Sequence, residues 1–85
     1  FVKDPNAVLD YYVDWTRWLN GDTIATSVWT VPAGLTNAND SHTTTAATVW
    51  LSGGTVGEAY KVTNRITTTG GRTEDRSFDV KIAER

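Results

Sequence analysis

The sequence contains no cysteine, a single histidine and no long apolar run. Without cysteine the chain cannot form a disulfide, a thiolate metal site or a thiol nucleophile. No apolar stretch approaches the roughly eighteen residues that a membrane span requires. The formal net charge is −2 and no run of basic residues occurs, so the electrostatic signature of nucleic-acid binding is missing. We therefore expect neither a nucleic acid nor a membrane among the partners of this chain.

Catalytic and metal-binding groups are also scarce. His42 has no candidate nucleophile beside it, and the polar residues around it lack the carboxylate spacing of an EF-hand calcium loop. These neighbours are Asn37, Asn39, Asp40 and Ser41. The adjacent acids Glu74 and Asp75 would point to opposite faces of a strand, so they cannot easily share a substrate. The sequence therefore predicts no catalytic residue, no metal site and no cofactor, and we expect that the chain is not an enzyme.

Aromatic side chains, in contrast, are plentiful: four Trp, three Tyr and two Phe among 85 residues. We expect one small domain over residues 1–85, and a domain of this size buries only about 60–65% of its unfolded surface. Large rings are effective core fillers in such a chain, which is our first interpretation of the indoles. The alternative is a flat sugar-binding platform of exposed indoles, formed by Trp18, Trp29 and Trp50.

The clearest structural signal is a hairpin over residues 60–82. Tyr60, Val62 and Ile66 alternate with polar residues, and Phe78, Val80 and Ile82 do the same in a second run. Alternation with a period of two predicts strands that bury one face. The pair Gly70-Gly71 between the runs supplies the positive φ angles of a tight turn.

Charged residues on this hairpin have an ordinary structural interpretation. Arg65, Arg72 and Arg76 can pair across the strands with three nearby acids. These acids are Glu74, Asp75 and Asp79. Each such exposed cross-strand pair contributes only about 0.2–1 kcal/mol.

The N-terminal third of the chain predicts a lead-in arm, a strand and a helical turn. Residues 1–7 form the lead-in arm, in which Lys3 and Asp4 are expected to face solvent. Its first five residues, 1–5, could become ordered only on assembly. Aromatic and β-branched residues favour a strand over residues 9–15, and a short helical turn follows over residues 16–19. Asn20-Gly21-Asp22 is a strong turn signal.

The middle of the chain predicts two further strands separated by a loop. Residues 23–31 form a strand whose alternation slips, which a β-bulge between Ser27 and Trp29 would explain. Residues 35–44 are polar and predict an exposed loop, with a short edge strand as the alternative. Residues 45–51 form a strand with Ala47, Val49 and Leu51 on one face.

A glycine-rich corner at residues 52–57 precedes Tyr60. A tyrosine at this place can hydrogen-bond back over the corner from one sheet to the other, as in the tyrosine corner of immunoglobulin domains. Turn signals recur about every ten residues, which is typical of a sandwich. The sequence therefore predicts an all-β fold, an immunoglobulin/fibronectin-like β-sandwich of about six to seven strands.

A series of segments along nearly the whole chain forms a recognisable pattern. It begins with residues 10–22 and Thr23-Ile24. It continues through Trp29-Thr30-Val31-Pro32, residues 50–55, Tyr60, Asn64-Arg65-Ile66, Gly70-Gly71-Arg72 and Asp75-Arg76-Ser77. In these segments the chain resembles a family of small tailed-bacteriophage virion proteins. Members of this family are structural proteins with an immunoglobulin-like or fibronectin-like fold, often described as fibre–tail adaptors. Related small phage proteins with an immunoglobulin-like fold decorate heads.

The resemblance implies a non-enzymatic virion protein, most readily an adaptor that docks tail fibres onto the tail or neck. The alternatives are a head decoration protein and a carbohydrate-binding module. The expected partners are other virion proteins, either of the tail, neck and fibre or of the capsid, and many copies would assemble symmetrically. Because Tyr, Trp and Arg are frequent interface anchors, we name seven candidate docking residues. They are Tyr11, Tyr12, Trp15, Trp18, Arg65, Arg72 and Arg76.

Overall fold

The structure is a computed structural model that describes residues 1–84. Within this range the chain forms seven strands and one helical turn. They are β1 (Val2–Lys3), β2 (Leu9–Asp14), α1 (Thr16–Leu19), β3 (Ile24–Thr30), β4 (Leu35–His42), β5 (Ala46–Gly53), β6 (Ala59–Thr68) and β7 (Thr73–Ile82). The predicted all-β sandwich is confirmed.

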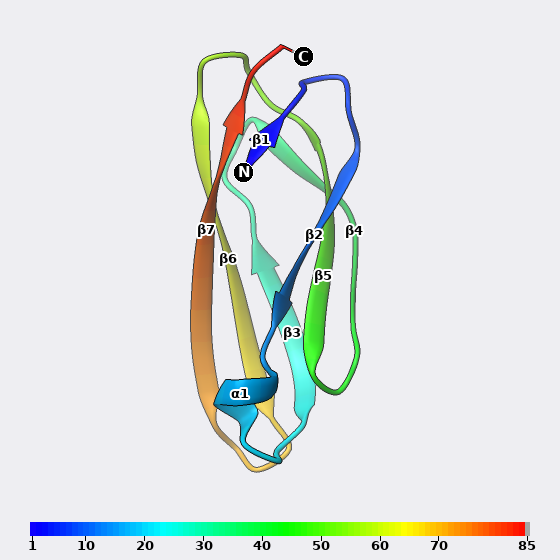
Figure 1. The fold of residues 1–85 in the computed structure, drawn as a ribbon, viewed down its shortest axis with the longest axis vertical. Helices are drawn as coiled ribbons and strands as arrows, with labels where there is room; N and C mark the ends of the chain where they lie inside the picture. The colour runs from blue at the N-terminus through cyan, green and yellow to red at the C-terminus, as the bar shows by residue number, and fades with distance from the viewer. Residues whose placement is uncertain (85) are drawn as a thin grey trace.

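Two sheets face each other in an elongated body of 41 × 19 × 16 Å (Figure 1). The four-stranded sheet has the order β1-β7-β6-β3 and the three-stranded sheet the order β2-β5-β4. All neighbouring strands are antiparallel except β1 and β7, which are parallel. In Figure 1, α1 and the β6–β7 turn lie at the lower end, and β1 lies at the upper end.

The predicted hairpin is β6–β7, with Tyr60 opposite Val80 and Val62 opposite Phe78. Its turn is closed by two backbone hydrogen bonds, from the Gly71 N–H to the Thr68 carbonyl and from the Thr68 N–H to the Arg72 carbonyl, of 3.0 and 2.8 Å. The predicted position of the turn and the predicted faces are therefore confirmed, but only Gly71 of the glycine pair has a positive φ, of 89°.

The glycine-rich corner carries the chain from β5 in the three-stranded sheet to β6 in the four-stranded sheet. The Thr55 N–H donates a hydrogen bond of 3.1 Å to the Tyr60 hydroxyl oxygen. This contact ties the corner to the strand that follows it, as predicted for Tyr60.

Two sequence-based predictions in the middle of the chain are wrong. Residues 35–44 are not mainly a loop: the alternative, an edge strand, is what forms, and at eight residues β4 (Leu35–His42) is longer than the short strand expected. Its polar side chains are mostly exposed, so backbone pairing with β5 holds it in place rather than apolar burial. The bulge of β3 lies between Ile24 and Thr26 and not between Ser27 and Trp29. This position leaves Ile24 and Trp29 facing the core and Val28 exposed.

The lead-in arm also differs from the prediction. Val2–Lys3 pairs with β7, and Lys3 is completely buried rather than solvent-facing. Its Nζ donates hydrogen bonds of 2.8 Å to the carbonyl oxygens of Asp4 and Gly53, which compensate for the removal of the ammonium group from water. Burial lowers the pKa of Lys3. The arm is therefore part of the sandwich in the isolated chain.

Two apolar clusters fill the space between the sheets. The larger one contains Val49, Leu51, Val62, Val80 and further residues of both sheets. The smaller one, at the end that α1 covers, contains Trp15, Leu19, Ile24 and Ile66. On β6 the buried Asn64 stands between Val62 and Ile66, so a polar side chain lies where the two clusters meet.

Candidate docking surfaces

The seven candidate docking residues do not form one patch. Four of them gather at the end of the sandwich that α1 covers, one lies on the outer face of the four-stranded sheet, and two lie on opposite faces of β2. In this order they are Trp15, Trp18, Arg72 and Arg76, then Arg65, then Tyr11 and Tyr12.

Trp15 is the centre of the α1 end and has no exposed surface. Its indole Nε1 donates a hydrogen bond of 2.9 Å to the Asn64 Oδ1 on β6. The Arg76 guanidinium lies 4.6 Å from the centre of its ring, and the Trp18 ring packs edge-on at 5.5 Å. The core-filling interpretation is therefore confirmed for Trp15, and a partner cannot reach this indole in the folded chain.

Arg72 fastens α1 to the β6–β7 turn. Its guanidinium donates hydrogen bonds to the carbonyl oxygens of Leu19 and Trp18, of 2.6 and 3.4 Å, and lies 4.4 Å from the centre of the Trp18 ring. These carbonyls are at the end of the helical turn, where a cation is favourable. The Asp22 carboxylate lies 3.5 Å from the same guanidinium. Arg72 therefore stabilises the α1 end, and its exposed part remains available for contact.

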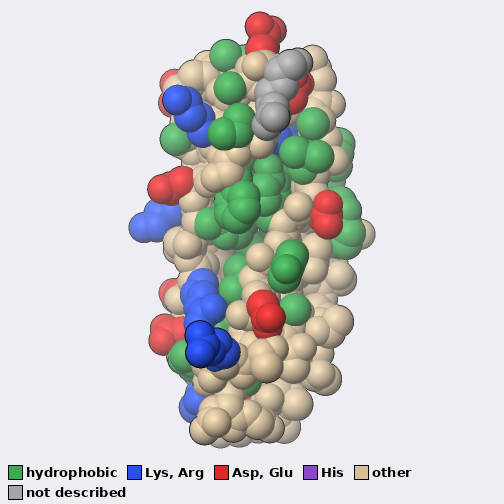
Figure 2. Space-filling model, in the orientation of Figure 1, with side chains coloured by type: hydrophobic (Ala, Val, Ile, Leu, Met, Phe, Trp, Pro, Cys, Tyr) green, Lys and Arg blue, Asp and Glu red, His purple; other side chains and the backbone are tan. Residues whose placement is uncertain are grey.

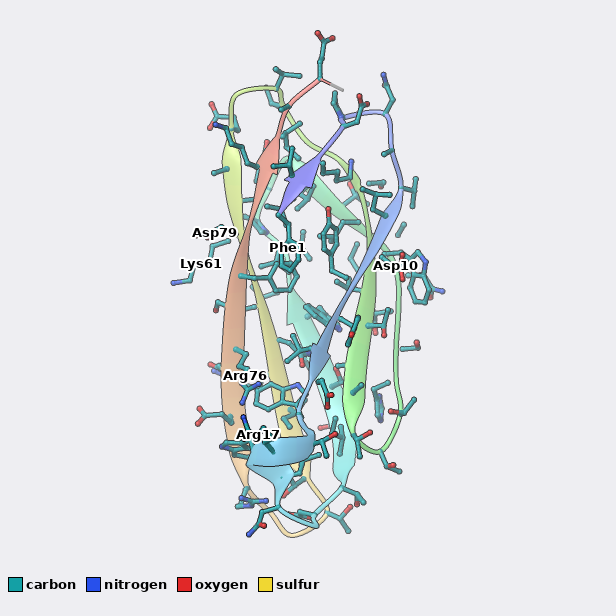
Figure 3. All side chains as sticks on the ribbon, in the orientation of Figure 1. Phe1, Asp10, Arg17, Lys61, Arg76 and Asp79 are labelled. Atoms are coloured by element: carbon teal, nitrogen blue, oxygen red, sulfur yellow. The ribbon has the colours of Figure 1, made fainter. Side chains whose placement is uncertain are left out.

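Arg76 lies four residues after Arg72, in β7, and also reaches a backbone carbonyl. Its side chain leaves β7 towards β2 and donates a hydrogen bond of 3.3 Å to the Asp14 carbonyl (Figure 3). The prediction that Arg72 and Arg76 pair across the hairpin with acids of β7 is therefore wrong. Both reach backbone carbonyls of residues 14–19, which are distant in sequence.

Arg65 does make the predicted cross-strand pair. It lies directly opposite Asp75, and its guanidinium donates two hydrogen bonds of 2.7 and 3.0 Å to that carboxylate. These bonds lower the pKa of Asp75. Both side chains are well exposed, so the pair contributes little to stability but leaves this part of the surface without free charge.

Tyr11 and Tyr12 point in opposite directions from β2. Tyr11 is buried against Phe1 and Phe78, with ring centres 5.1 and 5.7 Å away. Burial raises its pKa, and the charge of Asp10 adds to this effect. Tyr12 is 67% exposed on the outer face of the three-stranded sheet. Of the two, only Tyr12 offers its ring to a partner.

Apolar side chains remain exposed along the gap between β7 and β2, as Figure 2 shows. The structure places Phe1, Val2, Val8 and Leu9, all from the N-terminal segment, among the exposed large apolar side chains. Phe1 extends into this gap (Figure 3). This surface was not predicted, because residues 1–7 were expected to be a lead-in arm and not a part of the sandwich.

The predicted sugar platform is not present in the structure. Trp18 packs on the smaller cluster and Trp29 on the larger one, between the sheets. Trp50 belongs to β5, where alternation with the buried Val49 and Leu51 turns it to the outer face. The three indoles therefore have no common face on which a sugar could stack.

Residues 1–84 contain no helix with the length and apolar character of a membrane span. In the same range no group of three or more His, Asp or Glu side chains is arranged to hold a metal ion.

Comparison with known protein families gives a match over residues 3–81 to the family described as "Podophage GP4 fiber-tail adaptor protein gp77". The chain belongs to this family. The matched range spans both sheets of the adaptor-family domain and leaves out only Val2 of β1 and Ile82 of β7 among strand residues. A comparison with curated proteins gave no match.

Membership of the fibre–tail adaptor family agrees with the resemblance seen in the sequence. It favours the adaptor over the head decoration protein, because the description names the tail and its fibres. All seven candidate docking residues fall inside the matched range.

Proposed function

We propose that this chain is a non-enzymatic component of the virion that joins fibres to the tail. The observation that carries the proposal is the family match over residues 3–81. The chain would act by docking: each copy makes modest contacts, and several copies arranged symmetrically gain avidity from multivalency.

We further propose that the sandwich is of the immunoglobulin type. In such domains strands C, F and G form one sheet, and strands B, E and D belong to the other. The order β7-β6-β3 against β2-β5-β4 corresponds to G-F-C against B-E-D when the strands are taken in chain order. The hydrogen bond from the Thr55 N–H to Tyr60 supports the same assignment.

The candidate docking residues divide into contact residues and supporting residues. Tyr12, Arg65, Arg72 and Arg76 are exposed and can touch a partner. Tyr11 and Trp15 are buried, and Trp18 is half-buried. In this proposal these three rings do not touch the partner and instead support the contact residues by packing beneath them.

The proposal is tested by deleting the gene for this chain and counting fibres on the resulting particles by electron microscopy. Tails with few or no fibres, restored when the unmodified chain is supplied, are the expected result. Particles that lack the chain and still carry their full set of fibres would overturn the proposal.

A further inference from the structure

The outer face of the three-stranded sheet combines two rings, the exposed Tyr12 and the half-buried Trp50, with acidic side chains. On β2, Tyr11 points to the core, so alternation turns Asp10, Tyr12 and Asp14 outward. In the register of the sheet Asp10 lies opposite Trp50, and Tyr12 lies opposite Thr48. We call this surface the acidic face and define it by Asp10, Tyr12, Asp14, Thr48 and Trp50.

Tyr12 and Trp50 are diagonal neighbours on the acidic face. The register places Trp50 two residues from Thr48, the direct partner of Tyr12. Diagonal Cα positions in an antiparallel pair lie about 7–8 Å apart, within reach of aromatic side chains. Tyr12 is 67% exposed, and Figure 3 shows the Asp10 side chain pointing away from the sandwich. The face therefore presents rings and a carboxylate together.

The unbalanced charge of residues 1–84 lies on this same sheet. Strands β2, β4 and β5 carry three carboxylates and no Lys or Arg. Residues 58–84 carry five basic and five acidic side chains, so their charges cancel. Outside the three strands, the rest of the chain up to residue 57 has two basic residues, Lys3 and Arg17, and two acidic ones, Asp4 and Asp22, which also cancel. The three unbalanced carboxylates are Asp10, Asp14 and Asp40.

The opposite outer face, on the four-stranded sheet, carries basic as well as acidic side chains. Arg65 is held by Asp75 through two hydrogen bonds, and Lys61 lies directly opposite Asp79. Thr63 and Ser77 hydrogen-bond to each other at 2.8 Å. An arginine-bearing partner would therefore meet cations on that face, whereas β2, β4 and β5 carry none. Arg76 of β7 approaches the acidic face at its Asp14 end, and Asp10 lies at the other end of β2.

We propose that the acidic face docks a neighbouring virion protein through an arginine-bearing surface, with guanidinium groups stacked on Tyr12 and Trp50 and paired with Asp10. A guanidinium can stack on a ring and bind a carboxylate at the same time, which an ammonium does less well. The chain already contains this combination at Arg72, which stacks on Trp18 and contacts Asp22. The inference rests on the proposed function and specifies the surface that one of the two partners occupies.

The test measures binding of the purified chain to two probes: phage particles that lack the chain, and purified tail fibres. The informative variants are Tyr12→Ala and Asp10→Asn, and the matched control is Lys61→Gln on the opposite face. We expect Tyr12→Ala to weaken binding to one of the probes about tenfold, because exposed rings at interface centres are hot spots. Asp10→Asn should weaken binding to the same probe and reduce its salt dependence. Lys61→Gln should bind both probes like the unmodified chain.

Thermal unfolding checks that each variant is folded. We expect both to unfold near the temperature of the unmodified chain, because the Tyr12 and Asp10 side chains are exposed. If both informative variants are folded and bind both probes like the unmodified chain, the inference is wrong while the proposed function stands. If they alter only self-association, a second copy of the chain occupies the face, and the inference is again wrong. If the unmodified chain binds neither probe, the proposed function itself fails and the inference fails with it.

Discussion

At the scale of single residues, Asn64 connects parts of the chain that are far apart in sequence. Its Oδ1 accepts a hydrogen bond from the Trp15 indole, and its Nδ2 donates to the Ser27 hydroxyl and the Val28 carbonyl, at 2.9 and 3.3 Å. This one side chain links the α1 end to β6 and β3. A buried amide of this kind is stabilising only while all its partners are present.

Replacing Asn64 with Ala should therefore destabilise the chain. The Trp15 N–H would be left buried without an acceptor, at a cost of about 1–3 kcal/mol. Urea unfolding followed by tryptophan fluorescence measures the change. Lys61→Gln, on the exposed face of the same strand, should change the free energy of unfolding by no more than about 0.5 kcal/mol. Equal stability of the two variants would contradict this role for Asn64.

Asp22 makes the stability of the α1 end depend on pH. Its pKa is lowered by a hydrogen bond from the Thr68 side chain, by the backbone N–H groups of Thr23 and Gly70, and by Arg72. A carboxyl group whose pKa is lower in the folded chain contributes stability above its unfolded value, about 3.9. This contribution is lost as the pH falls through the folded pKa.

The free energy of unfolding should therefore fall as the pH is lowered from about 5 to about 2, and it should fall less in Asp22→Asn. Asp14 and Asp75 also have lowered pKa values, so part of the dependence remains in the variant. Thr67→Ala, which removes no carboxyl group, serves as the control and should keep the full dependence. An unchanged pH dependence in Asp22→Asn would contradict the assignment.

At the scale of elements, the glycine corner sets how β5 passes to β6. Gly54 has φ +102°, and a Cβ atom there would lie 2.6 Å from two side-chain carbons of the fully buried Ile82. Gly57 has a similar φ of +89°, but no atom lies within 4 Å of the place its Cβ would take. A side chain at Gly57 would strain only the backbone, whereas one at Gly54 would also collide with Ile82, so comparing the two positions distinguishes the two effects.

Gly57→Ala should cost about 1–2 kcal/mol for the left-handed backbone alone. Gly54→Ala should cost about 1–3 kcal/mol more, because the core around Ile82 must also rearrange. Comparison of the thermal unfolding midpoints of the two variants with that of the unmodified chain tests this. Equal midpoints for the two variants would contradict this, because they would show that the Ile82 side chain moves aside without destabilising the chain.

The elements predicted best from the sequence are those whose side chains alternate. The β6–β7 hairpin and the inward face of β5 follow from apolar residues at every second position. Strand β4 could not be found in this way, because its Asn, Asp and Ser side chains are exposed and only its backbone pairs. The bulge of β3 was predicted, but its position depends on the register with β6, which the sequence of β3 does not contain.

The candidate site was predicted only in part for a similar reason. The Arg65–Asp75 pair follows from counting residues across a hairpin. The partners of Lys3, Arg72 and Arg76 are carbonyl oxygens brought close by the fold, and every residue has a carbonyl, so no side-chain pattern identifies them. Likewise, the sequence does not show that Asp10, Asp14 and Asp40 belong to one sheet that has no Lys or Arg; the strand order is needed for this.

At the scale of the whole molecule, the sandwich is an elongated body with two dissimilar outer faces. One face carries basic and acidic side chains, among them the Arg65–Asp75 pair, and the other presents carboxylates and rings on strands that contain no Lys or Arg. Such a body suits a link between two different partners, since each face can be recognised by a different surface. The central claim is that this link lies between the tail and its fibres.

The most direct test is a cryo-electron microscopy reconstruction of the virion tail with its fibres attached. We expect density that fits this 41 × 19 × 16 Å sandwich and touches both the tail and a fibre, repeated around the tail. Density for the sandwich only on the head surface, or at a place in the tail that no fibre touches, would contradict it.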